Sequence, residues 1–187
     1  MSAVLCEAFQ ADYWKPVQAG LPRDTDTVAR LISNHKTVCH IERFLLRTAV
    51  SPHAAAKIDG VSITLDQFRR PDTQNHLIVE GAGGCLVPLN DEHLMADLIA
   101  TLGMEAIVVS NHYLGSINHT LMTLEALKNR GIPVKGLIFN GEPNAETERI
   151  IQRMSGVRCL LRIAREVSVD KAVVRKYAML LNEHWHE

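Results

Sequence analysis

Short apolar runs alternate with helical segments along this chain, and this alternation restricts its folds more than any other feature. The runs are YWKPV, HLIVEG, AIVVSN and VKGLIFN, and they are typical of strands buried on both faces. The segments HLMADLIATLG and SINHTLMTLEALKNRG have helical spacing and end at Gly103 and Gly131. The pattern predicts an α/β fold with a doubly wound, mostly parallel sheet and helices on both faces. Ligands bind such sheets at the carboxyl ends of the strands.

The rest of the chain is less regular. Residues 20–74 mix short helical pieces with Pro52 and Gly60, and we interpret them as an insertion-like region over the active face. The segment VDKAVVRKYAMLLNEHW has apolar residues at helical spacing, which predicts a closing amphipathic helix. We find no repeat, low-complexity tract or linker, so we expect residues 1–187 to form one domain.

Composition narrows the class of function. A formal charge of −1 and a pI near 6.8 provide no electrostatic attraction for nucleic acid or an anionic membrane. The four cysteines contain no C-x-x-C pair, which favours reduced thiols over a disulfide framework or zinc site. No apolar run approaches the roughly 20 residues that span a bilayer. We therefore expect a soluble, cytoplasmic protein that acts on a small molecule or binds a protein partner.

The motif LIVEGAGG places an acid and three glycines directly after a buried strand. Gly81, Gly83 and Gly84 allow a tight turn and a close approach of the backbone to a phosphate. Glu80 at this edge is a suitable oxygen ligand for Mg²⁺, which commonly takes carboxylates together with substrate phosphates. A glycine-rich turn with an exposed acid is the alternative interpretation.

Lys15 and the acids of DTDTV complete a second candidate cluster. An ammonium group in an apolar strand is costly to bury unpaired, but it is useful beside a phosphate or a developing anion. Asp24 and Asp26 come just before an apolar helical face, so either could cap the helix, and Asp26 could share a metal with Glu80. The alternative for Lys15 is a side chain that extends to solvent at a strand edge.

Two further segments follow predicted strands. In LGSINH, Ser116 is a plausible N-cap, and the free amides of the helix that begins near Ile117 could hold a carboxylate. In LIFNGE, Asn140 has an amide that could pair with the edge of a base. Ordinary capping and a simple turn are the alternatives.

Taken together, YWKPVQAG, DTDTV, SPH, LIVEGAGG, LGSINHTLMTLEAL and GIPVKGLIFN resemble the ATP-dependent dethiobiotin synthetases, in the order of that family. The resemblance covers residues from about Ala3 to Asn140. It implies a P-loop NTPase-like homodimer that builds the ureido ring of dethiobiotin from 7,8-diaminononanoate, CO₂ and ATP with Mg²⁺. The substrate carbamate is phosphorylated, and the second amine then closes the ring.

The resemblance also assigns roles to residues. Lys15 would steady the carbamate and the transferring phosphoryl group, and Asp26 and Glu80 would hold Mg²⁺. Nucleotide contacts would come from Gly81, Ala82, Gly83 and Asn140, the last of them to adenine. The substrate carboxylate would lie, across the dimer interface, at the amides of Gly115, Ser116, Ile117 and Asn118.

Three departures from the family pattern stand out. Ala19 occupies a substrate-side position where the family often has a hydroxyl, and LLRIARE replaces a Gly-Arg-Ile-Pro-like turn that touches the nucleotide. These 187 residues also contain no G-x-x-x-x-G-K-[ST] motif. We therefore expect an N-terminally truncated domain without its first strand and P-loop, and we expect the loss of those donors to abolish turnover.

Two alternative functions remain open at this point. One is a catalytically inactive substrate-binding or dimerisation module of the same fold, without the ATP phosphate cradle. The other is a related amidotransferase-linked or partitioning P-loop ATPase, against which LGSINH argues.

Overall fold

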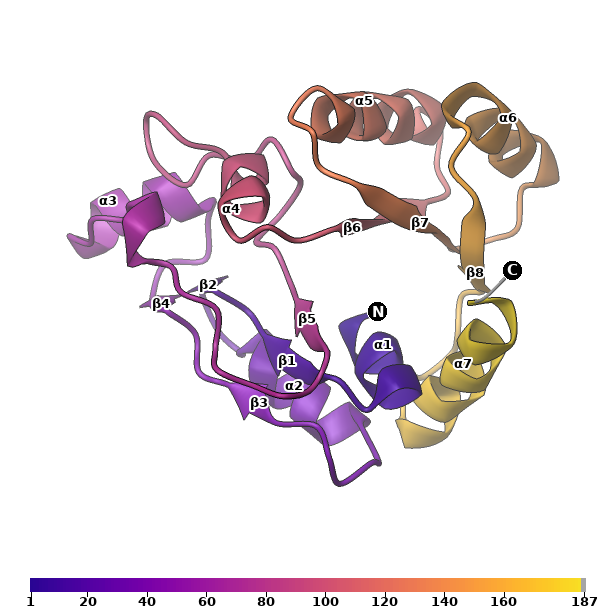
Figure 1. Cartoon of the computed structure of the whole chain (residues 1–187), viewed down its shortest axis with the longest axis horizontal. Helices are drawn as coiled ribbons and strands as arrows, with labels where there is room; N and C mark the ends of the chain where they lie inside the picture. The colour runs from indigo at the N-terminus through magenta and orange to yellow at the C-terminus, as the bar shows by residue number, and fades with distance from the viewer. Residues whose placement is uncertain (186–187) are drawn as a thin grey trace.

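The computed structural model describes residues 1–185, and its strands and helices alternate one by one from residue 77 onward (Figure 1). The helices are α1 (Ser2–Phe9), α2 (Asp24–Leu31), α3 (Pro52–Asp59), α4 (Met95–Thr101), α5 (Ser116–Lys128), α6 (Ala145–Ser155) and α7 (Lys171–His184), with a 3-10 turn η1 (Leu65–Gln67). The strands are β1 (Asp12–Trp14), β2 (Val17–Ala19), β3 (Cys39–His40), β4 (Phe44–Leu46), β5 (Leu77–Val79), β6 (Ala106–Asn111), β7 (Val134–Asn140) and β8 (Cys159–Ile163). This confirms the predicted α/β class.

The described strands pair only in parallel and form three groups, ordered β3-β1-β5, β2-β4 and β6-β7-β8. Tyr13 of β1 lies between Cys39 and Ile78 in register, and Leu137 of β7 pairs with both Val108 and Cys159. Between the described residues of β5 and β6 there is no ladder, so these strands do not form the single continuous sheet that the sequence pattern predicts.

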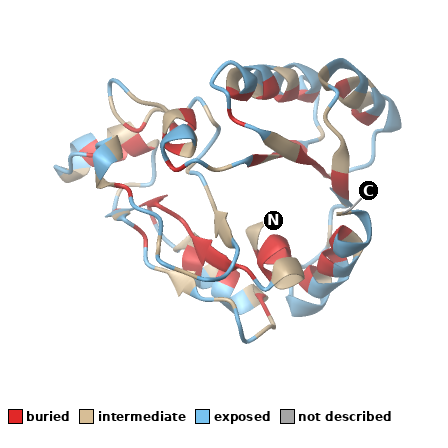
Figure 2. Cartoon of the chain, viewed as in Figure 1, coloured by how far each residue is buried: buried red, intermediate tan, exposed pale blue. Residues whose placement is uncertain are grey.

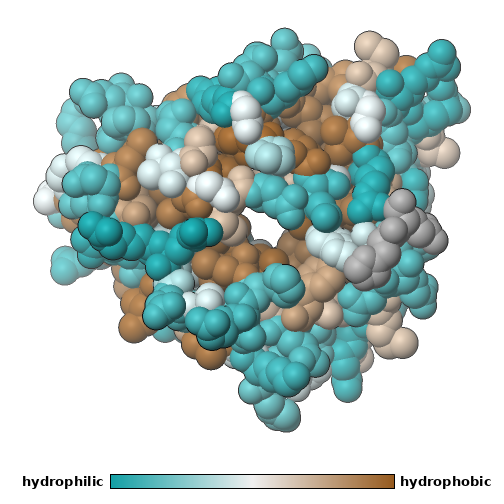
Figure 3. Space-filling view, in the orientation of Figure 1, coloured by the Kyte–Doolittle hydropathy of each residue, from teal (hydrophilic) through white to brown (hydrophobic). Residues whose placement is uncertain are grey.

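The strands divide the molecule into two halves, one with β1–β5 and one with β6–β8. An opening passes through the molecule between these halves, and hydrophobic residues border much of it in the space-filling view (Figure 3). All three residues of β5 are only half-buried, although the strand is apolar. Strand β6 alternates between buried and more accessible residues, and its Val109 is exposed. Strands β5 and β6 are therefore less buried than their apolar sequences predict.

The predicted strand YWKPV is divided at Pro16. Proline lacks the backbone N–H that a ladder needs, and β1 ends at Trp14 while β2 begins at Val17. Lys15 lies in this break between the two strands, at the carboxyl end of β1. Strand β1 therefore ends directly before Lys15, the first residue of the candidate site.

The interpretation of residues 20–74 as an insertion-like region is wrong in part. This stretch contains α2, and it also contributes β3 to the sheet of β1 and β4 to that of β2. Unlike β1 and β5, these two short strands do not lie in a longer apolar run, because charged residues interrupt the sequence around them. Strand β8, which falls in the LLRIARE region, was likewise not predicted.

Three apolar clusters hold the fold together, and buried residues concentrate where helices meet strands (Figure 2). The first cluster joins the halves: Cys6 of α1 and Tyr13 of β1 pack in it with Leu160 of β8 and Leu181 of α7. Helices α1 and α7 are also in direct contact, with Phe9 against Trp185 at 4.5 Å between ring centroids. The two halves are therefore connected mainly through these helices.

The helix ends agree with the predictions in part. Gly103 and Gly131 have φ of 62° and 66° just after α4 and α5, as expected for residues that end helices. Ser116 is not the N-cap of α5, because Gly115 takes that place and Ser116 is the first helical residue. Helix α7 is the predicted C-terminal helix and begins at Lys171, with Asp170 accepting hydrogen bonds from two backbone N–H groups.

No helix within residues 1–185 is long and apolar enough to cross a bilayer.

Candidate active site

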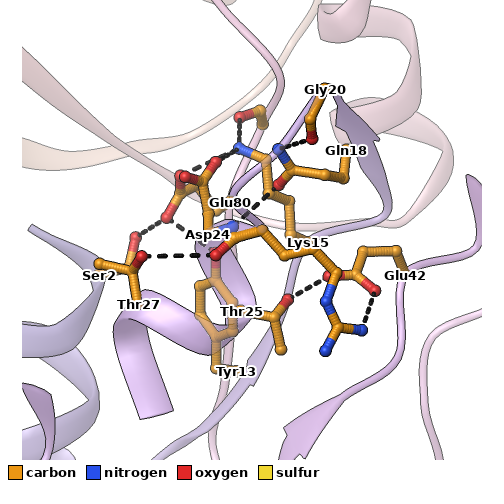
Figure 4. A network of polar contacts seen from close by, with 12 residues as sticks. Ser2, Tyr13, Lys15, Gln18, Gly20, Asp24, Thr25, Thr27, Glu42 and Glu80 are labelled. Atoms are coloured by element: carbon orange, nitrogen blue, oxygen red, sulfur yellow. Dashed lines mark hydrogen bonds and ion pairs between the residues drawn. The ribbon is translucent and has the colours of Figure 1, made fainter. Parts of the chain in front are cut away.

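Lys15 is the centre of the polar network at the carboxyl end of β1 (Figure 4). Lys15 is only 6% exposed, and its Nζ lies 2.8 Å from Asp24 Oδ2 and 3.0 Å from Glu80 Oε1. The ammonium also donates a hydrogen bond to the Gly81 carbonyl oxygen at 3.2 Å. Burial alone would lower the pKa of Lys15, but the hydrogen bonds and charges of the two acids raise it above its usual value. The ammonium therefore stays charged.

Glu80 follows β5 and receives donors on both carboxylate oxygens. Lys15 donates to Oε1, and the Tyr13 hydroxyl donates to Oε2 at 3.0 Å. Ser2, at the start of α1, donates to the same Oε2. Burial alone would raise the pKa of Glu80, whereas these hydrogen bonds and the Lys15 charge lower it below its usual value. Glu80 is thus a negative charge fixed in orientation.

Tyr13 is fully buried in β1. Burial, and then the charge of Glu80, raise the pKa of Tyr13 far above its usual value. Its hydroxyl therefore stays protonated and remains a donor to Glu80 at any ordinary pH. No pattern in the sequence distinguishes this tyrosine from ordinary core residues.

The two acids of DTDTV take different positions in the first turn of α2. Asp24 contacts Lys15, whereas Asp26 accepts hydrogen bonds from Arg23 Nε at 2.9 Å and Nη2 at 2.6 Å. Neither acid is the N-cap, a place that Arg23 occupies without a side-chain cap. The structure therefore brings Asp24, and not the predicted Asp26, together with Lys15 and Glu80.

The glycine-rich loop lies directly beside this cluster. Gly81 receives the Lys15 hydrogen bond, Ala82 is half-buried, and Gly83 has a φ of 82°. A Cβ at Gly83 would also lie 2.9 Å from Val87 Cγ2, so both space and backbone conformation favour glycine there. Ala19, at the end of β2, is half-buried next to Gly20. Exposed backbone beside a buried cation suits an anion such as phosphate.

The other predicted residues lie at the start of α5 and at the end of β7, in the part of the chain that forms the sheet β6-β7-β8. Gly115 has a φ of 103° and caps α5, Ser116 is buried behind it, and Ile117 and Asn118 are exposed in the first turn. Asn140 ends β7 and donates a hydrogen bond to Asn111 at 3.5 Å. No hydrogen bond or ion pair among residues 1–185 links these residues to Lys15. The candidate site therefore has two parts, one around Lys15 and one at the start of α5 and the end of β7.

Besides Tyr13 and Ser2, sequence reasoning missed two polar residues that support the turn of Asp24 and Thr25. Gln18 Oε1 accepts a hydrogen bond from the Asp24 backbone N–H at 3.1 Å, and buried Glu42 accepts one from Thr25 at 2.6 Å. A polar side chain inside the apolar run around KPVQ was a signal for Gln18. No pattern in the sequence distinguished Glu42.

The carboxylates near Lys15 provide the oxygen ligands that Mg²⁺ prefers. Glu80 and Asp24 supply carboxylate oxygens from separate elements, and Asp26 lies in the same first turn of α2 as Asp24, where it is paired with Arg23. Mg²⁺ commonly takes one or two carboxylates and completes its shell with water and phosphate oxygens. In the part of the chain that the structure describes, no group of three or more His, Cys, Asp and Glu forms a dedicated metal cage. The residues present thus suit a metal that arrives with a phosphate ligand.

Comparisons with known proteins agree with this chemistry. Residues 1–173 match a family model described as an AAA domain, a class of P-loop NTPase. The ATP-dependent dethiobiotin synthetase BioD of Cytophaga hutchinsonii is 52% identical over 189 residues, which cover 100% of this chain and 92% of that protein. The enzyme of the same name from Christiangramia forsetii is 46% identical over 95% of this chain and 86% of its own length. The Brucella ovis protein is 47% identical over 87% of this chain and 77% of its own length. The chain belongs to the family of ATP-dependent dethiobiotin synthetases, a family of ligases.

Proposed function

We propose that this protein forms dethiobiotin from 7,8-diaminononanoate, CO₂ and ATP. The observation that carries the proposal is the buried Lys15 ammonium, held between Asp24 and Glu80 beside the exposed Gly81–Gly84 backbone. That arrangement suits phosphoryl transfer, which depends on positioning and charge neutralisation more than on a nucleophilic side chain. The identity to the dethiobiotin synthetases supports the choice of substrate.

The reaction proceeds in three steps. One substrate amine attacks CO₂ and loses a proton, which gives a carbamate. A carbamate oxygen attacks the γ-phosphorus of ATP and ADP leaves, which gives a mixed carbamic-phosphoric anhydride. The second amine attacks the carbonyl carbon, loses its proton and expels phosphate, which closes the ureido ring.

Lys15 assists the steps in which negative charge moves. The carbamate and the γ-phosphoryl group are both anionic, and the fixed ammonium reduces the repulsion between them. Asp24 and Glu80 keep this ammonium charged and in place before substrates arrive. Because its donors are already oriented, little reorganisation is needed during the reaction.

Magnesium would be held by Glu80 and by Asp26, as the family resemblance implies, with Asp24 as the Lys15 counter-ion. When bound, the ion neutralises phosphate charge and helps to align the γ-phosphoryl group. Gly81, Ala82 and Gly83 would border the phosphates, and Asn140 would bind adenine through its amide.

The substrate carboxylate would bind at the start of α5. The amides around Gly115, Ser116, Ile117 and Asn118 lie at the positive end of a helix of 13 residues. Ala19 would contact the substrate near Lys15 without the hydroxyl that the family often has there. The same part of the chain exposes several apolar side chains: Val109, Tyr113, Leu114, Ile117 and Met122. Their exposure supports a homodimer in which the partner subunit covers this face.

We further propose a single-domain protein with a P-loop NTPase-like doubly wound arrangement that acts in the cytoplasm. The parallel strand pairing and the apolar contacts that join the two halves support one domain. A near-neutral pI and half-buried or buried free thiols are consistent with that location.

The proposal is tested by product analysis with the complete gene product. Incubation with 7,8-diaminononanoate, bicarbonate, ATP and Mg²⁺ should yield one ADP and one phosphate for each dethiobiotin, measured by mass spectrometry and a coupled ADP assay. Binding of the diamine with no ATP-dependent product would instead support the inactive binding module.

A further inference from the structure

Glu42 is a buried carboxylate with no part in the chemistry described above. Glu42 lies between β3 and β4 in the sequence and is 7% exposed. Its Oε1 accepts a hydrogen bond from the Thr25 hydroxyl at 2.6 Å (Figure 4). Its Oε2 is buried without a hydrogen-bond partner and lies 3.6 Å from Arg23 Nη1. A buried charge is costly unless it is paired, so the arginine is the group that makes this carboxylate tolerable.

Arg23 is shared between two acids. Its Nη1 faces Glu42, while its Nε and Nη2 bind the two oxygens of Asp26. One guanidinium can contact both because its donors point in different directions in one plane. The Glu42 charge therefore competes with Asp26 for the same cation.

The first turn of α2 is held from two sides. Gln18 Oε1 accepts the Asp24 backbone N–H, and Glu42 accepts the Thr25 hydroxyl. Gln18 takes the place of the missing N-cap interaction, because Arg23 caps the helix without a side-chain hydrogen bond, and Glu42 holds the same turn through the Thr25 side chain. The turn held in this way carries Asp24, which contacts Lys15, and Asp26.

We propose that Glu42 is a positioning residue that holds the acid-bearing turn of α2 in place beside Lys15 and keeps Asp26 available to a metal ion. This role rests on the proposed function, because it requires Asp26 to bind the metal that accompanies ATP. Without the Glu42 charge, Asp26 is the one acid among the described residues that remains paired with Arg23. A metal must then displace a tighter ion pair, so it binds more weakly.

The test is Mn²⁺ binding in the presence of ATP, followed by electron paramagnetic resonance, with Mn²⁺ in place of Mg²⁺. Glu42→Gln keeps an oxygen that can accept the Thr25 hydrogen bond but removes the charge that faces Arg23. Changes next to a metal ligand typically weaken metal binding 10- to 100-fold, and we expect about 10-fold for this variant. Thr25→Val should weaken binding as well, and Thr25→Ser should restore it because the hydroxyl returns.

Glu7→Gln is the matched control. Glu7 accepts hydrogen bonds from the backbone N–H groups of Ser33 and Asn34, so it holds the opposite end of α2. This variant should lower stability in urea unfolding and leave Mn²⁺ affinity unchanged. A merely structural role for Glu42 would make both glutamine variants behave alike.

Each outcome decides the proposal. Wild-type Mn²⁺ affinity in folded Glu42→Gln, or an equal loss in Glu7→Gln, overturns the role of Glu42. Failure of the wild-type protein to bind Mn²⁺ with ATP overturns both the metal site and this role. Normal Mn²⁺ binding with the expected variant pattern, but no dethiobiotin from the wild type, would refute the proposed reaction and leave the positioning role supported.

Discussion

At the scale of single residues, the site depends on one cation that is held by acids from distant parts of the sequence. Lys15 meets Asp24 from α2 and Glu80 from the end of β5. The sequence indicated Lys15 and Glu80 because a charge in or directly after an apolar run is unusual. It could not distinguish Asp24 from Asp26, since both lie in the first helical turn and side-chain orientation decides which one meets the lysine.

Replacing Lys15 by methionine should nearly abolish turnover. The side chain keeps much of its length and apolar stem, but the charge between the two acids is lost. Removal of one preorganised donor to a reacting oxyanion typically costs about 10²- to 10³-fold in kcat, and we expect a loss of at least that order. Lys57→Met, at an exposed position on α3, is the control and should keep wild-type activity in the same ADP assay. Substantial turnover by Lys15→Met would contradict the role of this lysine.

The two α2 acids should differ in the kinetic parameter that they control. Asp26→Asn should raise the Mg²⁺ concentration needed for half-maximal rate by about 10-fold, as expected when a carboxylate near a metal is lost. Asp24→Asn should mainly lower kcat, because Asp24 helps to hold the Lys15 ammonium. Steady-state rates over a Mg²⁺ titration distinguish the two. The reverse assignment, with only Asp24→Asn raising the Mg²⁺ requirement, would show that Asp24 is the ligand.

At the scale of elements, hydrogen bonds to a buried carboxylate in β1 stabilise the sheet β3-β1-β5. Asp12 accepts hydrogen bonds from the Val38 backbone N–H at 2.9 Å, from Thr73 at 2.6 Å and from Asn75 at 3.0 Å. It thereby ties the residue before β3 and the loop before β5 to the strand between them. Burial alone would raise the pKa of Asp12, but these hydrogen bonds, with one to His40, lower it to about 2.

This shift makes a prediction for stability in acid. The folded-state pKa lies below the unfolded value, so the ionised carboxylate stabilises the fold above about pH 4 and this contribution is lost as the pH falls toward about 2. The contribution is about 2 kcal/mol at neutral pH. Urea unfolding between pH 7 and pH 2 should show a smaller acid-induced loss of stability in Asp12→Asn than in the wild type. Equal losses in the two proteins would contradict the account.

The elements differ in how far the sequence predicted them. Helices α5 and α7 are long enough for a helical period to appear, and β6 and β7 lie in continuous apolar runs. Strands β3 and β4 have neither signal, and their place is fixed by pairing with β1 and β2. The positions of Gln18 and Glu42 likewise follow from tertiary contacts, which no local pattern records.

At the scale of the whole molecule, the proposed homodimer places a partner subunit at the start of α5. Leu114 is fully exposed there, between exposed Tyr113 and the cap Gly115. Exposed apolar residues that gather at one place commonly mark an interface. The sequence predicted the helix end, but only the structure shows that this leucine lies outside the core.

Leu114→Asp should therefore weaken the homodimer. A charge placed in an apolar interface must be desolvated when the subunits associate, so the dissociation constant should rise by about 10-fold or more. Val167→Asp is the control, because Val167 is equally exposed but lies outside α5, before α7. Sedimentation velocity over a range of concentrations measures both variants. A dimer unaffected by Leu114→Asp would place the interface elsewhere.

The central claim is that the protein phosphorylates a carbamate and closes a ureido ring. It is tested most directly by running the reaction of the complete gene product with ¹⁸O-labelled CO₂ and unlabelled water. The mechanism predicts one labelled oxygen in the phosphate released and one in the ureido carbonyl of dethiobiotin. Unlabelled phosphate, which indicates that water rather than a carbamate attacked ATP, would contradict it.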